Sequence, residues 1–534
     1  MSSSQYRRFA APREDRALVV DPPWEDVGGL IAANVARRAE SAKCDVGGRS
    51  LADLSQEARA DLLAAARRWT AAYRPVGPAT EDPGGPILMA GHQPELFHPG
   101  VWLKNFALGT LAPRHAATAV NLVIDSDTIK DTSLAVPGGT LEAPRRESLR
   151  LDQPEPALPF EERRVVDARQ FADFGRRVAQ EIAALVPDPL LSDYWPMVID
   201  RLRETDRLGY CMAQARHQLE GRWGLQTLEV PQSWVCESEA FRWFVMHMLA
   251  ECERFQEIYN QAVHEFRRAH RIRSTAHPVP DLARDGRWIE AALWIWTAEA
   301  PRRRRLFVCR EDRGLVVSDR GDLEFRLPWG PARGAATVEA LSEWSRRGVR
   351  IRSRALVTTL WARLALGDLF LHGIGGAKYD QVTDRLIERF FGLQPPGVLV
   401  LSATLYLPLG APQGMADELR SIQRQLRDLV FHAELVMDPP PPPEVRDLIE
   451  AKRRWVLSPQ TCENARQRWQ SIRQINEALQ PFVADRRRRL IESQANVARA
   501  LRAEKVLHWR EYGFCLYPEK ILKEFFSELL PKNA

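Results

Sequence analysis

The segment ILMAGHQPELFHPGVWLKNF, residues 87–106, constrains the fold of this chain more than any other stretch. An apolar run typical of a buried strand ends at a glycine, and a polar loop with two histidines follows it. A helix is predicted over about residues 100–112, and a second apolar run covers residues 119–125. A strand, a short loop, a helix and another strand in this order predict the beginning of a parallel α/β sheet.

The same pattern returns far along the chain. GDLFLHG (367–373) is predicted as a strand, and a glycine-rich loop, a helix and the apolar run 397–409 follow it. The residues between the two units have the pattern of helices over about 168–272 and of short β-like pieces after that. We therefore predict an α/β fold, in which one Rossmann-like parallel-sheet core is interrupted by helical insertions.

A wholly helical pattern begins beyond residue 410. Apolar residues recur at spacings of four and three, which is the pattern of a coiled-coil seam. The seam consists of Met415, Leu419, Ile422, Leu426, Leu429, Ala433 and Val436. The predicted domains are an N-terminal helical segment (1–79), the core with its insert (80–410), a helical coiled-coil arm (411–505) and a C-terminal tail that docks on the core (506–534).

The composition is that of an ordinary soluble globular protein, with 45% hydrophobic and 27% charged residues. A net charge of +5 on 534 residues is small, so nucleic acid is not a favoured partner. The N-terminus lacks the apolar segment of a signal peptide, and the most apolar window, 355–371, contains Arg363 and Asp368. The seven cysteines form no CxxC pair of the kind found in zinc sites. We expect a cytoplasmic protein with no membrane partner and no metal site.

The loop after the first strand is the first candidate site, because α/β sheets bind ligands at the carboxyl edge of their parallel strands. His92 and His98 are its candidate catalytic residues. His98-Pro99-Gly100-Val101 is similar to the HxGH element of nucleotidyltransferase-like folds, with valine in place of the last histidine. The alternative is a plain strand-to-helix turn whose histidines cap backbone groups. The candidate substrate-binding residues of this loop are Gly91, Gln93, Gly100 and Lys104.

Asp125 and Asp127, at the end of the second strand, form the next candidate site. Carboxylates at this edge can orient a substrate amine or accept its proton. Capping of a loop is the alternative role, since aspartate is a common turn residue. Neighbouring parallel strands bring both loops to one crevice, which favours the catalytic role.

The third candidate site is the glycine-rich loop HGIGGAKYD (372–380), again between a strand and a helix. Glycines there allow backbone N–H groups to surround a phosphate or carboxylate. The spacing matches neither a P-loop nor the dinucleotide-binding fingerprint. The candidate substrate-binding residues of this loop are Gly373, Gly375, Gly376, Lys378 and Tyr379.

The three loops, in this order, resemble the motifs of the bacillithiol biosynthesis cysteine-adding enzymes, a family of cysteine ligases. The resemblance is carried by residues 91–100, by Asp125-Ser126-Asp127 and by Gly375–Tyr379. The chain also departs from the family pattern. His92 replaces a glutamine, His98-Pro99-Gly100 replaces Thr-Gly-Pro, the acidic element lacks the family's histidine, and Lys378 stands where an acidic or neutral residue is usual.

The resemblance implies a ligase-like enzyme that condenses cysteine or another amino acid with the amine of a small, amino-sugar-like acceptor. His92 and His98 would bind or protonate the developing oxyanion, Asp125 and Asp127 would orient the amine or accept its proton, and the Gly375–Gly376 loop would hold an anionic group. The resemblance also implies a homodimer formed through the arm.

The sequence leaves several points open. Whether a nucleotide such as ATP is consumed cannot be read from these residues. A nucleotidyltransferase-like enzyme that acts through the HxGH-like element is one alternative function. The other is a non-catalytic scaffold or binding protein, whose coiled-coil arm carries the function and whose core is degenerate.

Overall fold

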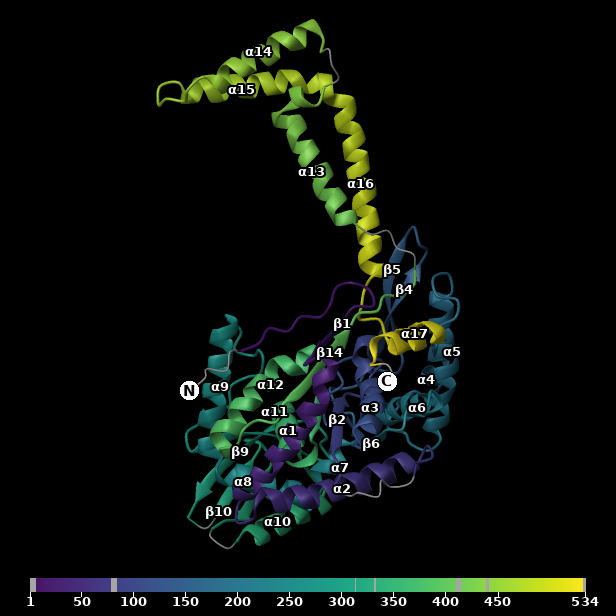
Figure 1. The fold of residues 1–534 in the computed structure, drawn as a ribbon, viewed down its shortest axis with the longest axis vertical. Helices are drawn as coiled ribbons and strands as arrows, with labels where there is room; N and C mark the ends of the chain where they lie inside the picture. The colour runs from purple at the N-terminus through teal and green to yellow at the C-terminus, as the bar shows by residue number, and fades with distance from the viewer. Residues whose placement is uncertain are drawn as a thin grey trace. The chain divides into compact units, whose positions relative to one another are not determined.

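The computed structural model describes residues 6–77, 84–312, 314–330, 333–409, 414–437 and 441–531. The chain divides into two compact units (Figure 1). Unit 1 consists of Met1–Val136, Ser148–Tyr406 and Arg510–Ala534, and unit 2 of Pro137–Glu147 and Leu407–Trp509. The domain boundaries predicted at 79/80 and 410/411 lie outside the described residues.

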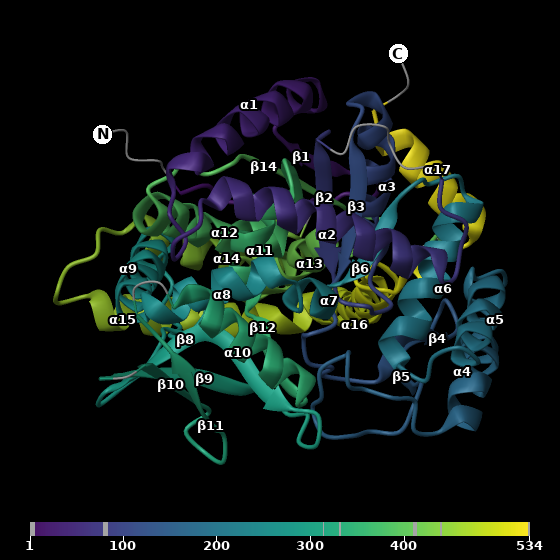
Figure 2. The ribbon, with the colours of Figure 1, turned by 90° about the horizontal axis from the view of Figure 1, so that it is seen from below.

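A six-stranded sheet with five parallel strands lies at the centre of unit 1 (Figure 2). In pairing order its strands are β1 (Leu18–Asp21), β14 (Val398–Ala403), β13 (Leu369–His372), β2 (Ile87–His92), β3 (Thr118–Val123) and β6 (Leu228–Pro231). Only the edge strand β1 runs antiparallel to its neighbour. The predicted α/β class with parallel strands in one sheet is therefore confirmed.

Helices pack against this sheet. Ile87 and Met89 of β2 share a buried core with Leu54 and Leu62 of α2 (Leu51–Ala71). α3 (Pro99–Arg114) packs against β2, β3 and β14. The first four residues of β2 are all buried, and alternate side chains of a strand point to opposite faces. Burial on both faces explains why the strand is an uninterrupted apolar run in the sequence.

The stretch predicted to be helical contains a strand as well as helices. Its helices are α4 (Ala168–Ile182), α5 (Leu191–Leu202), α6 (Leu208–Arg222), α7 (Gln232–Cys236), α8 (Glu239–Ala250) and α9 (Cys252–His270). β6 lies between α6 and α7 and pairs in parallel with β3, so it belongs to the central sheet. The sequence analysis missed this strand, because it is four residues long and contains Glu229.

A second, antiparallel sheet follows α9 in the chain. In pairing order its strands are β11 (Glu324–Pro328), β10 (Gly314–Ser318), β9 (Arg304–Glu311), β8 (Trp288–Thr297) and β12 (Val349–Ser353), with β7 (Arg284–Asp285) beside β8. α10 (Gly334–Arg346) packs on this sheet. From β12, α11 (Ala355–Trp361) and a π-helical turn, Ala362–Leu366, lead back to β13. The second sheet thus lies between the two halves of the central sheet along the chain.

The C-terminal tail returns to unit 1. α17 (Glu519–Leu529) packs on α3, where the Phe526 and Phe106 rings stack with centroids 3.8 Å apart. β4 (Ser133–Gly139) and β5 (Pro144–Arg150) pair in a separate two-stranded sheet.

Unit 2 is largely helical. Its helices are α13 (Met415–Phe431), α14 (Pro443–Leu457), α15 (Ala465–Leu479) and α16 (Ala484–Leu507). α13 packs on α16, and α14 packs on α15. Within the predicted heptad seam Ile422, Leu429 and Ala433 are buried, and the remaining seam residues are half-buried. The seam therefore marks the inward side of α13.

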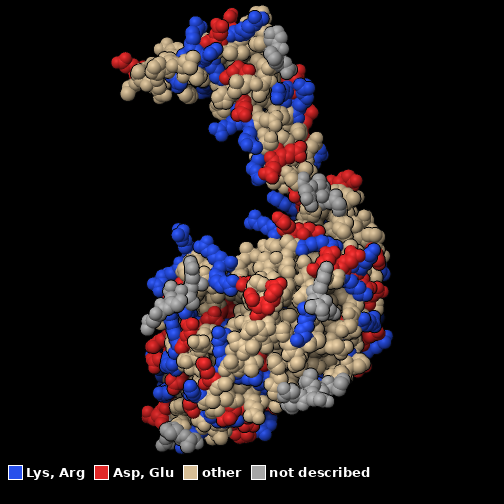
Figure 3. All heavy atoms as spheres, viewed as in Figure 1, with Lys and Arg blue, Asp and Glu red and all other residues tan. Residues whose placement is uncertain are grey.

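The surface carries both signs of charge. Figure 3 shows acidic and basic side chains interspersed on the face in view. Within the described ranges, no helix combines the length and apolar character that a membrane crossing requires.

Candidate functional site

A cavity of about 560 Å³ lies at the carboxyl end of the parallel strands of unit 1. Its walls include the ends of β2, β13 and β14, the loop after β3, and residues of the inserted segments. β2 pairs with β3 on one side and with β13 on the other. The strand that follows β2 in the chain is thus added on one side and the later strands on the opposite side, so the strand order reverses at β2. Open α/β sheets bind ligands at such a reversal of strand order.

The cavity brings together most of the predicted site residues. Those that line it are Gly91, His92, Gln93, His98, Gly100, Lys104, Asp127, Gly373, Gly375, Gly376 and Tyr379. Asp125 and Lys378 were also predicted, and neither lines the cavity.

His98 is held at the start of α3. Its Nδ1 accepts a hydrogen bond of 3.1 Å from the backbone N–H of Gly100, so the imidazole caps the helix. A backbone N–H can only donate, and Nδ1 must therefore be unprotonated. The Gly100 bond is the shorter of the two contacts of the ring nitrogens, so the neutral ring carries its proton on Nε2, which lies 3.6 Å from the carboxylate of Glu511. The guanidinium of Arg510 can only donate, so its 3.4 Å approach to Nε2 is then a contact and not a hydrogen bond. His98 therefore both caps α3 and lines the cavity.

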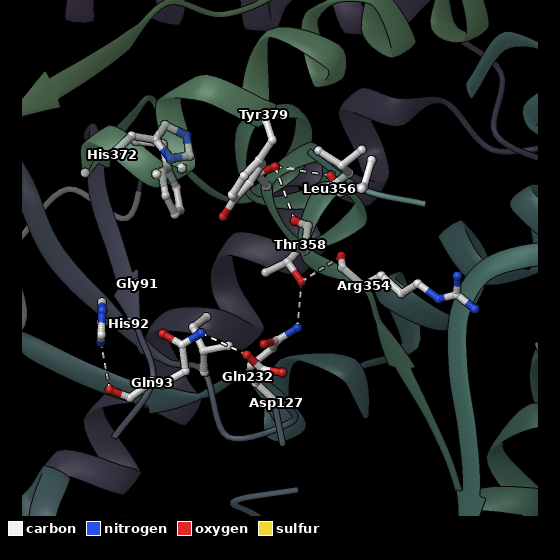
Figure 4. Close-up of a pocket in the computed structure, with 18 of the residues that line it drawn as sticks. Gly91, His92, Gln93, Asp127, Gln232, Arg354, Leu356, Thr358, His372 and Tyr379 are labelled. Carbon is white, nitrogen blue, oxygen red and sulfur yellow. Dashed lines mark hydrogen bonds between the residues drawn. The ribbon is translucent and has the colours of Figure 1, made fainter. Parts of the chain in front are cut away.

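His92 has the opposite tautomer. Its Nδ1 lies 3.0 Å from the carbonyl oxygen of Gln93, and a carbonyl can only accept, so Nδ1 carries the proton (Figure 4). The Nε2 of His92 is therefore free to accept a hydrogen bond. The ring packs edge-on against Phe97, with centroids 4.6 Å apart.

Both histidines are uncharged at neutral pH. Burial lowers the pKa of His92 to about 3, and the positive charge of Lys104 adds to this effect. Burial also lowers the pKa of His98 to about 3, together with the charges of Arg510 and Lys104. Lys104 itself donates to the carbonyl of Gly91 at 2.9 Å, and burial lowers its pKa to about 8. The β2–α3 loop thus offers neutral imidazoles beside a buried amine.

The two aspartates of the second motif have different surroundings. Asp125 is fully buried, where it accepts hydrogen bonds from Ser233 and from the hydroxyl of Tyr210. These bonds tie β3 to α6 and α7, so its carboxylate is used within the protein. Asp127 lines the cavity, pairs with Arg303 at 2.8 Å, and accepts from the amide of Gln93 at 2.9 Å.

The glycine-rich loop forms the N-terminus of α12 (Ile374–Leu386). Among the described residues no side chain caps this helix. A Cβ added to Gly373 or Gly375 would meet no atom within 4 Å, so the first turn is open. A Cβ on Gly376, in contrast, would lie 2.7 Å from the Nδ1 of His372. Gly375 therefore leaves open space at the start of the helix, whereas Gly376 leaves room for the ring of His372.

Tyr379 extends from the second turn of α12 into the cavity (Figure 4). Burial raises the pKa of its hydroxyl to about 12, so it remains a hydrogen-bond donor at neutral pH. Lys378 precedes it and points elsewhere, because adjacent helical residues are about 100° apart around the axis.

Several cavity residues were missed by the sequence analysis. Gln232 begins α7, and its amide donates to Ser353 at 2.8 Å and to Thr358 at 2.7 Å. Its Oε1 is buried without a hydrogen-bond partner among the described residues. Trp294 of β8 contributes its ring, over which the guanidinium of Arg303 lies at 4.8 Å. These residues are far apart in the sequence and no motif links them, so no local pattern could have indicated them.

The part of the chain that the structure describes contains one close group of three potential metal ligands, His217, Glu220 and Glu229. Arg216 bridges the two glutamates of this group, since its guanidinium donates to one oxygen of each. Burial raises the pKa of Glu229, and Arg216 opposes that rise. The group is thus a buried ion-pair network filled by an arginine.

Neither models of known protein families nor curated proteins match the sequence.

Proposed function

We propose that the cavity of unit 1 is the active site of a ligase-like enzyme, which condenses an amino acid with the amine of a small polar acceptor. One observation carries this proposal: among the described residues, polar atoms that face the cavity have hydrogen-bonding capacity without a partner. The hydroxyl of Tyr379 can donate, whereas the Nε2 of His92 and the Oε1 of Gln232 can accept, and the Nε2–H of His98 lies beside them with Glu511 3.6 Å away. A ligand with both an amine and a carboxyl group matches this combination.

The size of the cavity agrees with a small-molecule substrate. A volume of about 560 Å³ lies within the range of roughly 300–1,000 Å³ that is typical of such sites. Lys104, Arg303 and Arg510 line it together with one carboxylate, Asp127, so cationic groups outnumber anionic ones in this set. An anionic group of the ligand is therefore favoured, and the uncapped N-terminus of α12 offers it free N–H groups.

Each group then has a chemical role. The Nε2–H of His98 donates to the oxygen on which negative charge develops as the nitrogen attacks the carboxyl carbon. His92 and Gln232 accept hydrogen bonds from the amine. Asp127, paired with Arg303, orients the loop through Gln93. The resemblance to cysteine ligases makes cysteine the first candidate amino acid and an amino sugar the first candidate acceptor.

We also propose that the core is Rossmann-like. In chain order, the parallel strands β6-β3-β2-β13-β14 are the third, second, first, fourth and fifth, which is the order of doubly wound dinucleotide-binding sheets. Amide formation must expel an oxygen from the carboxylate, and ATP is the co-substrate that would activate it.

The nucleotidyltransferase-like function has less support. A Cβ on Gly100 would lie 1.9 Å from the carbonyl oxygen of Ala403, so contact with β14 already explains this glycine. The spacing of His98-Pro99-Gly100 therefore needs no bound phosphate to account for it.

Product analysis tests the proposed function. Purified protein is incubated with cysteine and amino-sugar acceptors, with and without ATP, and the condensed product is sought by mass spectrometry. We expect product from the wild type and a loss of about 10²-fold or more in His98→Leu, which removes an oxyanion donor. His264→Gln is the control, because His264 is exposed on α9. An absence of product in every wild-type reaction would contradict the proposal.

We propose, in addition, that unit 2 forms a homodimer interface. It contains most of the large apolar side chains that are exposed in the described structure. They include Phe431, Leu435, Leu457, Trp469 and Ile491. Exposed apolar groups gathered on a helical unit are typical of surfaces that pair with another chain.

A further inference from the structure

His372 ends β13, directly before the glycine-rich loop. Only 3% of this residue is exposed, and it lines the cavity. Figure 4 shows it beside the first turn of α12, on the same side of the cavity as Tyr379. The imidazole fits there because residue 376 is a glycine, whose hydrogen leaves room for Nδ1.

A buried carboxylate lies behind this imidazole. The Nε2 of His372 is 3.0 Å from the Oδ2 of Asp380, a residue of α12 that is 2% exposed. Gly376 and Asp380 are four residues apart, so they face the same side of the helix, one turn after the other. The helix thus supplies both the space for the ring and the partner for its Nε2.

Arg363 fixes the carboxylate in turn. It lies in the π-helical turn after α11, and its Nη1 is 2.6 Å from the Oδ2 of Asp380. Its Nη2 is 2.7 Å from Asp384, one further turn along α12. Burial alone would raise the pKa of Asp380, but Arg363 and His372 outweigh burial and hold that pKa well below its usual range. Asp380 therefore stays ionised beside the ring.

This arrangement favours one tautomer of His372. Nε2 makes no well-aligned hydrogen bond among the described residues, but the carboxylate of Asp380 lies 3.0 Å from it and can only accept, so a proton of the neutral ring is favoured on Nε2. Nδ1 then carries a lone pair, and it has no hydrogen-bond partner among the described residues. His92 and His98 differ, because the Nδ1 of each is used by a backbone group. Among the described cavity histidines, His372 is the one backed by a buried carboxylate.

We propose that His372 is the general base of this active site, with Asp380 as its positioning residue and Arg363 as the residue that keeps Asp380 charged. This role rests on the proposed function. As the nitrogen of the acceptor forms its bond to the carboxyl carbon, its proton passes to Nδ1 of His372. The C–O bond then breaks, and the oxygen leaves with the electron pair. It departs as phosphate if a nucleoside triphosphate has activated the carboxyl group, or otherwise takes protons and departs as water.

A carboxylate behind an imidazole suits it to this task. The negative charge of Asp380 stabilises the imidazolium that forms when Nδ1 takes the proton, and it holds the ring in one orientation. His92 and His98 have no comparable partner, since Glu511 is 3.6 Å from His98 and half exposed. The three histidines therefore have separate roles: His98 donates, His92 accepts, and His372 takes the proton.

The test compares turnover with binding. His372→Gln keeps a polar side chain of similar length, and we expect product formation to fall by about 10²–10⁴-fold. Its affinity for cysteine, measured by calorimetry, should stay within about twofold of the wild type, because the general base contributes little to ground-state binding. Asp380→Asn should lower kcat more than it raises KM. His264→Gln serves again as the control.

Chemical rescue separates catalysis from structure. In His372→Ala, added imidazole should restore part of the turnover, because the vacated space beside Gly376 accepts a free ring. A merely structural histidine would show no such rescue. The melting temperature of each variant shows whether it folds. If a His372 variant does not fold, His372→Asn is used in its place.

The outcomes are distinct. If wild type and His372→Gln form product at the same rate, the role of His372 is wrong while the proposed function stands. If the wild type forms no product from any pair of substrates, the proposed function and this role fall together. The tautomer is read independently from histidine ¹⁵N shifts, with His372→Gln for assignment, and a proton on Nδ1 would overturn the geometry on which the proposal rests.

Discussion

Three histidines line the cavity, and the neighbour of each one sets its protonation. A carbonyl holds the proton of His92 on Nδ1, a backbone N–H keeps Nδ1 of His98 unprotonated, and the carboxylate of Asp380, 3.0 Å from Nε2, favours the proton of His372 there. The partners of His92 and His98 are backbone groups that lie within two residues of each histidine in the sequence. The third depends on the packing of α12 against β13, which is why the sequence analysis did not select His372.

The low pKa values of His92 and His98 predict a loss of stability in mild acid. Each has a pKa of about 3 in the folded protein, against about 6.5 in the unfolded chain. As the pH falls below about 6.5, the unfolded chain binds protons that the folded protein does not, so stability falls until about pH 3. Between pH 7 and pH 5 each histidine should cost about 2 kcal/mol.

Urea unfolding at pH 7 and at pH 5 checks this expectation. The loss of unfolding free energy between the two pH values should be smaller in His98→Gln than in the wild type by about 2 kcal/mol. His264→Gln, at an exposed position, should show the full wild-type loss. Equal losses in wild type and His98→Gln would contradict the assigned pKa.

At the scale of elements, the sequence predicted the strands that carry the site. β2, β3, β13 and β14 came from apolar runs, and the first three are each followed by a polar or glycine-rich loop; both signals are local. β1 and β6 were missed, since each is only four residues long and includes a charged residue. Their place in the sheet comes from pairing with partners that are distant in the sequence.

The candidate site was predictable in part for the same reason. Loops at strand ends are visible in a sequence, so His92, His98, Asp127 and the first turn of α12 were found. Gln232 reaches the cavity because it follows β6, the strand that was not predicted, and Trp294 and Arg303 reach it from the inserted second sheet. Asp125 was mistaken for a cavity residue, because the spacing of DSD does not tell which carboxylate turns inward to Ser233.

Two glycines at helix starts offer a matched pair of substitutions. Gly100→Ala places a Cβ 1.9 Å from the backbone oxygen of Ala403, so we expect a loss of about 3 kcal/mol or more of unfolding free energy. Gly375→Ala meets no atom within 4 Å, and it should change stability by less than about 1 kcal/mol. Denaturant unfolding of both variants measures these differences.

The same pair separates stability from binding. Gly375→Ala adds a methyl group in the open space at the start of α12, so it should weaken the binding of an anionic ligand while the protein remains folded. Equal stability losses in the two variants would show that the two helix starts do not differ as described.

At the scale of the whole molecule, unit 2 carries a testable interface. Trp469 on α15 is 59% exposed, which is unusual for the largest apolar side chain. Trp469→Glu should convert a dimer into a monomer, because a charge would be buried without a partner in the interface. Light scattering after gel filtration gives the molar mass of each species.

Gln470→Glu is the control for this substitution. It adds the same charge at the next residue of α15, which is exposed and already polar. The control should keep the oligomeric state of the wild type. A wild-type protein that is monomeric at micromolar concentration would contradict the proposed homodimer.

Isotope transfer tests the central claim about the cavity most directly. Cysteine labelled with ¹⁸O in its carboxyl group is incubated with the wild-type protein, an amino-sugar acceptor and ATP, and the products are weighed by mass spectrometry. We predict a condensed product that keeps one of the two carboxyl oxygens, with the other recovered in phosphate, and we predict that His98→Leu and His372→Gln each lower both signals by about 10²-fold or more. Labelled cysteine recovered unchanged with every acceptor, or product formed equally by both variants, would contradict the account.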